Sequence, residues 1–240
     1  MLNLVATPIG NLSDISTRAL TTLSEADLVV SEDTRKTGFL LNHFSISKPQ
    51  LSFRIDNEQR VLGKILGLLE QGKLIALVTD SGTPGISDPG FLLVRAALEK
   101  GIEVSAVPGP TAFVMALILS GLPIHSFTFR GFPPHKAGPR KRFIEVDAAS
   151  PHTLVYYESP YRLKAFLMNA VEILGERQAA VANDLTKKFE QVRRGTLSEL
   201  IEVYGFEDPR GEYTVVIEGA SEPSRMPDPQ PAKVKRVSRS

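Results

Sequence analysis

One loop, residues 80–90, carries the side chains best suited to bind a small molecule. Its eleven residues include three glycines and two prolines, which force a tight and exposed backbone turn. Polar groups crowd onto the same turn: Asp80, Ser81, Thr83, Ser87 and Asp88. Simple strand-to-helix connections have about 2–6 residues. We therefore expect a ligand site, although either aspartate taken alone could equally be a turn-forming residue.

The loop follows an apolar run at residues 74–78, which predicts a buried strand, and it belongs to a repeated pattern of strand, Pro/Gly loop and helix. The predicted strand at residues 2–6 runs into the loop 7–14, and the strand at residues 102–106 runs into the loop 107–112. Open α/β sheets bind ligands outside the carboxyl ends of their strands, so the three loops are expected to share one crevice. None of them is a phosphate-binding loop, because neither G-x-x-x-x-G-K-[ST] nor G-x-G-x-x-G occurs in the chain.

The wider pattern predicts an α/β protein with two domains. Strand and helix signals alternate through residues 1–120, which indicates a mainly parallel sheet with helices on both faces. A Gly-Leu-Pro break at residues 121–123 is the expected linker to a second α/β domain, residues 121–220. The shorter, more polar strands of that domain suggest a mixed sheet. Residues 221–240 contain four prolines, are basic and lack periodicity, which is typical of a disordered tail.

Composition sets further bounds on function. The chain has 240 residues, of which 42% are hydrophobic, enough for packed cores in two small domains. It has no cysteine, which excludes disulfides and Cys-based zinc or redox chemistry, and no metal-ligand pattern is evident. We find no signal segment and no apolar run of membrane length, so we expect a cytoplasmic protein without membrane contact. The net charge of +1 means that any case for nucleic acid must come from local patches.

Five motifs occur in a fixed order along the chain. They are VATPIGNL at residues 5–12, SEDTR at 31–35, ALVTDSGTPGISDPG at 76–90, VPGPTA at 107–112 and YESPYR at 157–162. Together they resemble the bacterial 16S ribosomal RNA cytidine 2′-O-ribose methyltransferases of the tetrapyrrole methylase superfamily. The resemblance covers residues 2 to about 219.

The resemblance implies a cofactor and a place for it. Relatives of this kind bind S-adenosylmethionine in a cleft between two α/β domains and form homodimers. The donor has no phosphate, so backbone groups and small hydroxyls suit it better than a phosphate-binding loop. By resemblance, the cofactor-binding residues are Pro8, Asp80, Gly82, Thr83, Ile86, Ser87, Thr111 and Ala112.

Methylation of a ribose hydroxyl requires a base that is held near its proton, with the hydroxyl about 3 Å from the methyl group. The SEDTR motif supplies Glu32, Asp33 and Arg35 at the end of a predicted strand. We expect Asp33 mainly to cap the following helix. Glu32, flanked by Arg35, is then the preferred base or ribose-positioning group. Glu58 is a second candidate.

Local basic clusters in the second domain suggest an RNA partner, namely 16S rRNA or the 30S subunit. The predicted RNA-binding residues are Lys136, Arg140, Lys141, Arg142, Arg162, Lys187 and Lys188. Such clusters neutralise phosphates, and nearby aromatic side chains could stack on bases. Each cluster taken alone could be a solvated helix face.

Two other functions remain open from the sequence. A methylase of a small tetrapyrrole-like substrate would not require the basic clusters. A non-catalytic RNA-binding protein of ribosome assembly would not need the intact loops at Pro8, Gly82 and Pro110.

Overall fold

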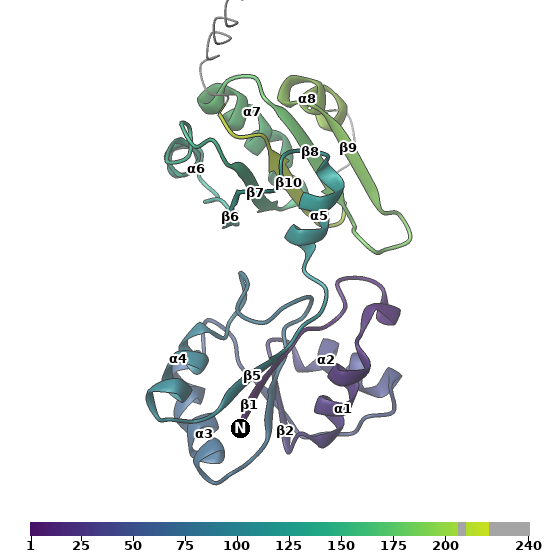
Figure 1. Cartoon of the computed structure of the whole chain (residues 1–240), viewed down its shortest axis with the longest axis vertical. Helices are drawn as coiled ribbons and strands as arrows, with labels where there is room; N and C mark the ends of the chain where they lie inside the picture. The colour runs from purple at the N-terminus through teal and green to yellow at the C-terminus, as the bar shows by residue number, and fades with distance from the viewer. Residues whose placement is uncertain (206–209, 221–240) are drawn as a thin grey trace, which may run out of the picture.

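The chain folds into two α/β lobes, one above the other in Figure 1. A computed structural model describes residues 1–205 and 210–220. Each lobe is built on a five-stranded sheet. Among the described residues, no helix is both long enough and apolar enough to cross a membrane. The predicted tail, residues 221–240, lies outside the described part of the chain.

The lower lobe contains a parallel sheet, as predicted. Its strands lie in the order β3-β2-β4-β1-β5, and all neighbouring pairs are parallel. In that order, the strands are Gln50–Ser52, Leu28–Ser31, Ile75–Leu77, Leu2–Val5 and Val104–Val107. The helices are α1 (Thr17–Glu25), α2 (Thr34–His43), α3 (Glu58–Glu70) and α4 (Phe91–Glu99), with a short 3₁₀ helix η1 (Leu12–Asp14).

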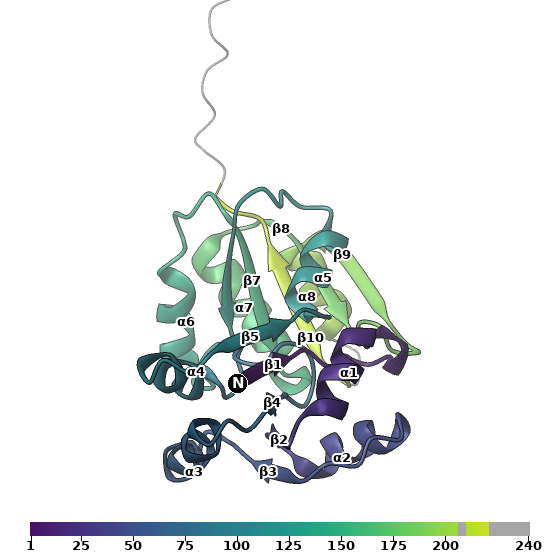
Figure 2. The same cartoon turned by 60° about the horizontal axis from the view of Figure 1, so that its bottom comes forward.

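Helices cover both faces of this sheet, α1 and α2 on one side and α3 and α4 on the other (Figure 2). The sequence of β4 explains why. Ile75 and Leu77 join the core under α3 and α4, whereas Ala76 joins the core under α1 and α2. Side chains alternate along a strand, so a strand that is apolar at every position must be buried on both faces. The packing brings the carboxyl ends of β1, β2, β4 and β5 to one edge, below the upper lobe.

The upper lobe contains the predicted mixed sheet. Its strands lie in the order β6-β7-β10-β8-β9; β6 and β7 are parallel, and the other pairs are antiparallel. In that order, they are Phe127–Gly131, Thr153–Glu158, Tyr213–Ile217, Gln178–Asn183 and Gln191–Thr196. One face is covered by α6 (Ala137–Glu145), α7 (Leu163–Leu174) and α8 (Leu197–Gly205), and the 3₁₀ helix η2 (Pro160–Arg162) precedes α7.

Helix α5 (Ala112–Ser120) packs on the other face of the upper sheet (Figure 1). Its residues Ala116 and Leu117 lie in one core with Val155 and Val216 of the central strands. The chain therefore crosses between the lobes before α5, at residues 108–111, and not at the Gly-Leu-Pro break. Gly121 instead ends α5 in the left-handed conformation, with φ of 77°, a common role of glycine after a helix.

The first loop of the lower lobe also contacts the upper lobe. Ile9 is 6% exposed and lies in the same core as α5. Gly10 approaches the connection between β8 and β9 so closely that a Cβ there would stand 2.5 Å from Cγ of Lys187. Only a glycine fits this contact. The loop after β1 thus helps to hold the two lobes against each other.

Candidate active site

A cavity of about 320 Å³ lies between the lobes, and we call it the interlobe cavity. The lower lobe lines it with Ile9, Glu32, residues 80–83, residues 86–88, Thr111 and Ala112. The upper lobe contributes Phe132, Tyr157, Glu158, Ser159, Pro160 and residues 211–214. Its volume lies within the range of about 300–1,000 Å³ that is usual for small-molecule sites.

Backbone and hydroxyl contacts fix the three lower loops against one another. The N–H of Thr7 donates to O of Gly82 at 2.8 Å, and the N–H of Gly82 donates back to O of Thr7 at 3.1 Å. Gly82 has φ of +89°, a conformation that side chains with a Cβ rarely adopt. The hydroxyls of Thr83 and Thr111 lie 2.7 Å apart and join the second loop to the third. The shared crevice of the three loops is therefore a single hydrogen-bonded frame.

The interlobe cavity is acidic. Its described lining includes five carboxyl groups and no lysine, arginine or histidine; the acidic residues are Glu32, Asp80, Asp88, Glu158 and Glu212. Such a lining attracts a cationic ligand and repels phosphates. Three of the five are paired with cations outside the lining: Asp80 with Lys36, Glu158 with Arg162 and Glu212 with Lys187. Glu32 and Asp88 are in no described ion pair, so the lining favours a cationic ligand over one that carries phosphates.

Two of these carboxyl groups hold their protons more tightly than usual. Burial raises the pKa of Glu32, and the negative charges of Asp80 and Asp88 raise it further. Burial is also the main cause of the raised pKa of Asp88, whose Oδ2 accepts a hydrogen bond from the hydroxyl of Thr79. A carboxylate with a raised pKa is a stronger base than one in water, so Glu32 is chemically suited to accept a proton.

Asp80 connects the second loop to the start of α2. Its Oδ1 accepts from the backbone N–H of Asp33 at 3.0 Å, and its Oδ2 accepts from Nζ of Lys36 at 2.8 Å. The hydrogen bond to Asp80 raises the pKa of Lys36, so this side chain remains an ammonium group. Lys36 is a cation that the sequence analysis did not select.

Asp33 and Arg35 face each other at the start of α2. Asp33 is the N-cap of the helix, and its Oδ1 accepts from the backbone N–H of Arg35. The Arg35 guanidinium donates to the same carboxylate, which holds the pKa of Asp33 well below its usual range. The Arg35 side chain is 89% exposed and lines neither of the two larger cavities. Glu58, at the start of α3, also lies outside both linings.

The upper lobe supplies a wall that the sequence analysis did not assign to the site. Tyr157 packs against Phe132, with 5.4 Å between ring centroids, and its hydroxyl accepts from the N–H of Phe113. Burial raises the pKa of Tyr157 to about 12. The buried Glu158 binds Nε of Arg162 through Oε1 at 2.9 Å, whereas its Oε2 has no described hydrogen-bond partner. The YESPYR motif was the one signal in the sequence that pointed here.

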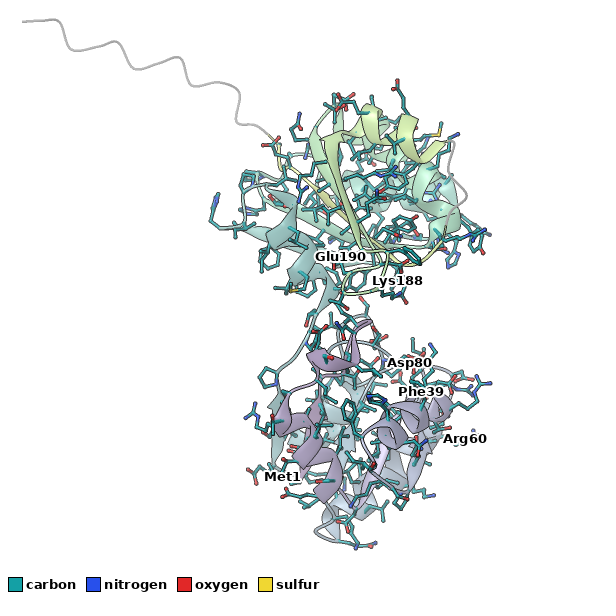
Figure 3. The ribbon with its side chains drawn as sticks, turned by 90° about the vertical axis from the view of Figure 1, so that its right-hand side faces the viewer. Met1, Phe39, Arg60, Asp80, Lys188 and Glu190 are labelled. Carbon is teal, nitrogen blue, oxygen red and sulfur yellow. The ribbon has the colours of Figure 1, made fainter. Side chains whose placement is uncertain are left out.

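A second cavity of about 250 Å³ lies beside the first, and it contains Pro8. By resemblance, Pro8 was expected with the cofactor-binding residues. Thr7, Pro8, Leu12, Lys36, Thr37, Phe39, Leu40, Thr79 and Asp80 line this second cavity. Asp80 lines both cavities and so stands between them. Figure 3 shows Asp80 and Phe39 on the side of the lower lobe that faces Lys188 and Glu190 of the upper lobe.

The predicted RNA-binding residues do not form one free basic surface. Arg140 is the clearest correction: it is 5% exposed, and its guanidinium donates to Oδ1 of Asn169 and to O of His135. It is therefore a buried structural residue that presents no free cation to a phosphate. Lys141 pairs with Glu172 at 2.6 Å on the neighbouring helix α7.

The other cations of that set differ in their exposure. Lys136, the N-cap of α6, and Arg142, in the last turn of α6, are both exposed. Arg162 binds Glu158, and Lys187 binds both Asp184 and Glu212 at 2.8 Å. Lys188 is exposed and lies over the ring of Phe189.

The comparisons with known proteins define the class of protein. A crystal structure of uroporphyrin-III-C-methyltransferase from Thermus thermophilus superposes on it with a TM-score of 0.62 at 22% identity, covering 90% of this chain and 93% of that chain. The family model for Tetrapyrrole (Corrin/Porphyrin) Methylases matches residues 1–201. The chain belongs to this family. It is a methyltransferase, and S-adenosylmethionine is its methyl donor.

Two curated relatives are much closer in sequence. The Ribosomal RNA small subunit methyltransferase I of Synechocystis sp. is 47% identical over 226 residues, which covers 94% of this chain and 81% of the relative. The protein of the same name from Thermotoga maritima is 44% identical over 218 residues, covering 91% of this chain and 98% of the relative. These matches confirm the resemblance that the five motifs indicated.

Proposed function

We propose that this methyltransferase modifies the ribose 2′-hydroxyl of a cytidine in 16S RNA of the small ribosomal subunit. The names of its relatives, at 44–47% identity over more than nine-tenths of the chain, support the RNA substrate. The observation that carries the proposal is the acidic interlobe cavity at the carboxyl ends of the strands. It suits a cationic methyl donor and offers no basic group among its described lining residues to the phosphates of the substrate.

The residues of the cavity fit S-adenosylmethionine. The donor is a sulfonium cation without phosphate, and the lining offers carboxylates and small hydroxyls with no basic group among its described members. Gly82, Thr83, Ile86 and Ser87 of the second loop would hold it. Thr111 and Ala112 of the third loop would approach from the same lobe, and on the opposite wall Oε2 of Glu158 remains available as an acceptor. We leave Pro8 out of this set because it lines the second cavity.

When bound, S-adenosylmethionine supplies an electrophilic methyl group on a positively charged sulfur. The protein's part is to position the ribose hydroxyl and to take its proton. Glu32 is the base in this proposal, since it lines the cavity and has a raised pKa. Lys36 stays protonated beside Asp80, so its role is to bind substrate oxygens and not to accept a proton. Asp33 and Arg35 hold the start of α2 in place through their mutual pair.

We further propose that the enzyme acts as a homodimer in the cytoplasm, where small subunits assemble. An apolar surface supports the dimer. Helix α5 packs on the upper sheet by one side only, and its outer side exposes Val114, Met115 and Ile118. Ile124 and Phe127, which follow α5 in the chain, are also exposed. We call these five residues the α5 surface.

Transfer of labelled methyl from S-adenosylmethionine to purified 30S subunits tests the function. The subunits should come from a strain that lacks the corresponding methyltransferase, with free 16S RNA assayed alongside. We expect label on a single ribose, which nuclease digestion and mass spectrometry would assign to a cytidine. Donor binding without any label on either RNA would overturn the proposal and favour a small-molecule substrate.

A further inference from the structure

The second cavity has the composition of a nucleotide site and not of a cofactor site. Four of its nine lining residues are apolar, namely Pro8, Leu12, Phe39 and Leu40, and three more are threonines. Lys36 is the one cation among the described lining residues. An exposed aromatic ring beside an ammonium group, here paired with Asp80, suits a nucleoside base that is attached to a phosphate.

Phe39 is placed to stack on a base. It is 68% exposed although it is a large apolar side chain, and it shares the lining of the second cavity with Thr37 and Leu40, which are buried residues of the same helix α2. Lys36 precedes Phe39 by three positions, so both lie on one face of α2. Single exposed apolar residues are common on protein surfaces. Phe39 differs from such residues because it lines a cavity together with the ammonium group of Lys36.

The second cavity adjoins the place of methyl transfer. Asp80 lines both cavities, and it binds Lys36 at 2.8 Å. On the same side of the molecule, Figure 3 shows Lys188 on the upper lobe opposite Phe39 on the lower lobe, with Arg60 farther down. Both of these cations are exposed. Glu190 lies next to Lys188, but its Oε2 already accepts from the backbone N–H of Thr186.

We call Lys36, Lys188 and Arg60 the basic rim. The interlobe cavity has no basic residue in its described lining, whereas the basic rim offers cations to phosphates. An RNA strand bound along the basic rim would keep its phosphates there and place one ribose near the methyl donor. Enzymes that act on a nucleotide often extrude it from its stack into a pocket. The second cavity adjoins the interlobe cavity at Asp80, the residue that the two described linings share.

We propose that the second cavity receives the base of the target nucleotide, flipped out of the RNA, with Phe39 stacked on the base and Lys36 bound to its ribose or phosphate oxygens. The proposal rests on the proposed function, because it assumes an RNA substrate. It places the 2′-hydroxyl at the Asp80 wall, turned toward the interlobe cavity. The RNA surface is then the α2 side of the cleft and not the basic helix α6.

A tryptophan at position 39 reports on the stacking directly, because the chain contains no tryptophan of its own. The variant F39W should lose fluorescence when a 16S RNA fragment that spans the methylated site is added, since a stacked base quenches the indole. The matched control is F91W. Phe91 is 67% exposed, starts α4 on the opposite face of the sheet and lines neither cavity. Its fluorescence should not change.

Kinetics provide the second readout. F39A should weaken RNA binding by about 5- to 100-fold, the range for loss of one base–aromatic stack. It should raise KM for 30S subunits, whereas donor affinity by calorimetry should be unchanged. F39Y should restore most of the loss, because it keeps the ring. F91A should behave as the wild type in all three measurements.

The outcomes separate the two proposals. If the wild type methylates 30S subunits, but F39A keeps the wild-type KM and F39W shows no quenching, the nucleotide site is wrong and the proposed function stands. If the wild type binds donor and methylates no RNA, the proposed function fails, and the nucleotide site fails with it.

Discussion

At the residue scale, the chemistry depends on a carboxyl group that is kept out of water. Glu32 follows the last residue of β2, where a parallel strand ends beneath the upper lobe. The neighbouring Asp80 and Asp88 add negative charge to the effect of burial. Asp80 is already paired with Lys36 at 2.8 Å, so Glu32 and Asp88 are the close carboxyl groups that are in no described ion pair. A cation bound beside them would stabilise their charged forms, which links donor binding to the proton affinity of the base.

Replacing Glu32 with glutamine should therefore slow methyl transfer while preserving donor binding. We expect a loss in kcat on the order of 10²–10⁴-fold, the usual contribution of a general base. The wild-type rate should rise with pH through the raised pKa of Glu32, because only the ionised form accepts a proton. That acidic limb of the profile should disappear in E32Q. If the rate of E32Q still falls at low pH as the wild-type rate does, another group is the base.

The same substitution should also change how the stability of the protein depends on pH. A carboxyl whose pKa is raised in the folded state contributes stability at low pH, and this contribution is lost as pH rises through the folded pKa. E32Q cannot ionise. Its stability relative to the wild type should therefore increase between about pH 4 and neutral pH. Thermal unfolding at several pH values measures this difference, and a difference that does not vary with pH would contradict the burial argument.

Gly82 is the residue on which the donor loop depends. A valine there must adopt φ near +89°, and its Cβ would lie 3.4 Å from Cγ2 of Ile9. We expect G82V to weaken donor binding about tenfold or more, which corresponds to about 1.4 kcal/mol. Gly72 provides a matched control, since it has φ of +82° but no atom within 4 Å of a built Cβ. G72V should lose similar stability in urea unfolding and keep its donor affinity. Equal donor affinity in both variants would reject the loop as the binding site.

At the scale of elements, α6 shows how a basic sequence can serve packing. The run from Lys136 to Arg142 suggested a phosphate-binding face. In the structure, Arg140 points into the lobe toward Asn169 of α7, and Lys141 bridges to Glu172 of the same helix. The cations of α6 thus hold two helices together. Of those selected, Lys136 and Arg142 remain exposed.

Substitution of Arg140 should therefore change stability more than RNA binding. R140A leaves the Asn169 amide oxygen and the His135 carbonyl without their donor, which should cost about 1–3 kcal/mol in the free energy of unfolding. R142A, at an exposed position, should stay within about 0.5 kcal/mol of the wild type. Urea unfolding measures both values, and RNA titrations at two salt concentrations measure binding. A stable R140A with much weaker RNA affinity would restore Arg140 to the RNA surface.

At the scale of the whole molecule, α5 follows the lower lobe in the chain but packs in the core of the upper lobe. It follows directly from the third loop of the lower lobe, so its first residue, Ala112, lines the interlobe cavity. Its buried side is part of the upper core, which makes it the structural link between the lobes. Its outer side remains apolar and exposed, and this is the surface that the proposed dimer would cover.

A charge on that surface should separate the dimer. Ile118 is 57% exposed, so I118E should fold normally and sediment as a monomer under conditions where the wild type is a dimer. V146E is the control, because Val146 is 72% exposed at the end of α6, away from the α5 surface. Sedimentation velocity distinguishes the two species. A wild type that sediments as a monomer would reject the dimer, and a dimeric I118E would move the interface elsewhere.

The sequence alone predicted the elements and the loops that line the lower half of the interlobe cavity. The apolar run at residues 74–78 marked a buried strand, and the glycines and prolines after it marked the loop that holds Gly82 and Thr83. These are local signals. A glycine with positive φ, an N-cap such as Asp33 and a strand apolar at every position are each determined by a few neighbouring residues. In a parallel sheet the carboxyl ends of the strands lie at one edge, so the loops that follow them meet there whatever their sequences.

Only the tertiary structure decided which distant residues complete the site. Glu158 reaches the cavity from the end of β7 and Glu212 from the residue before β10, and their position depends on how Ile9 and α5 pack the lobes together. It likewise decided that Arg140 is buried, that Pro8 lines the second cavity and that Phe39 stands beside Lys36 at the cleft. Periodicity and motifs describe local preference, whereas burial and proximity between lobes are set by long-range packing. The local sequence around any one of these residues does not carry that packing.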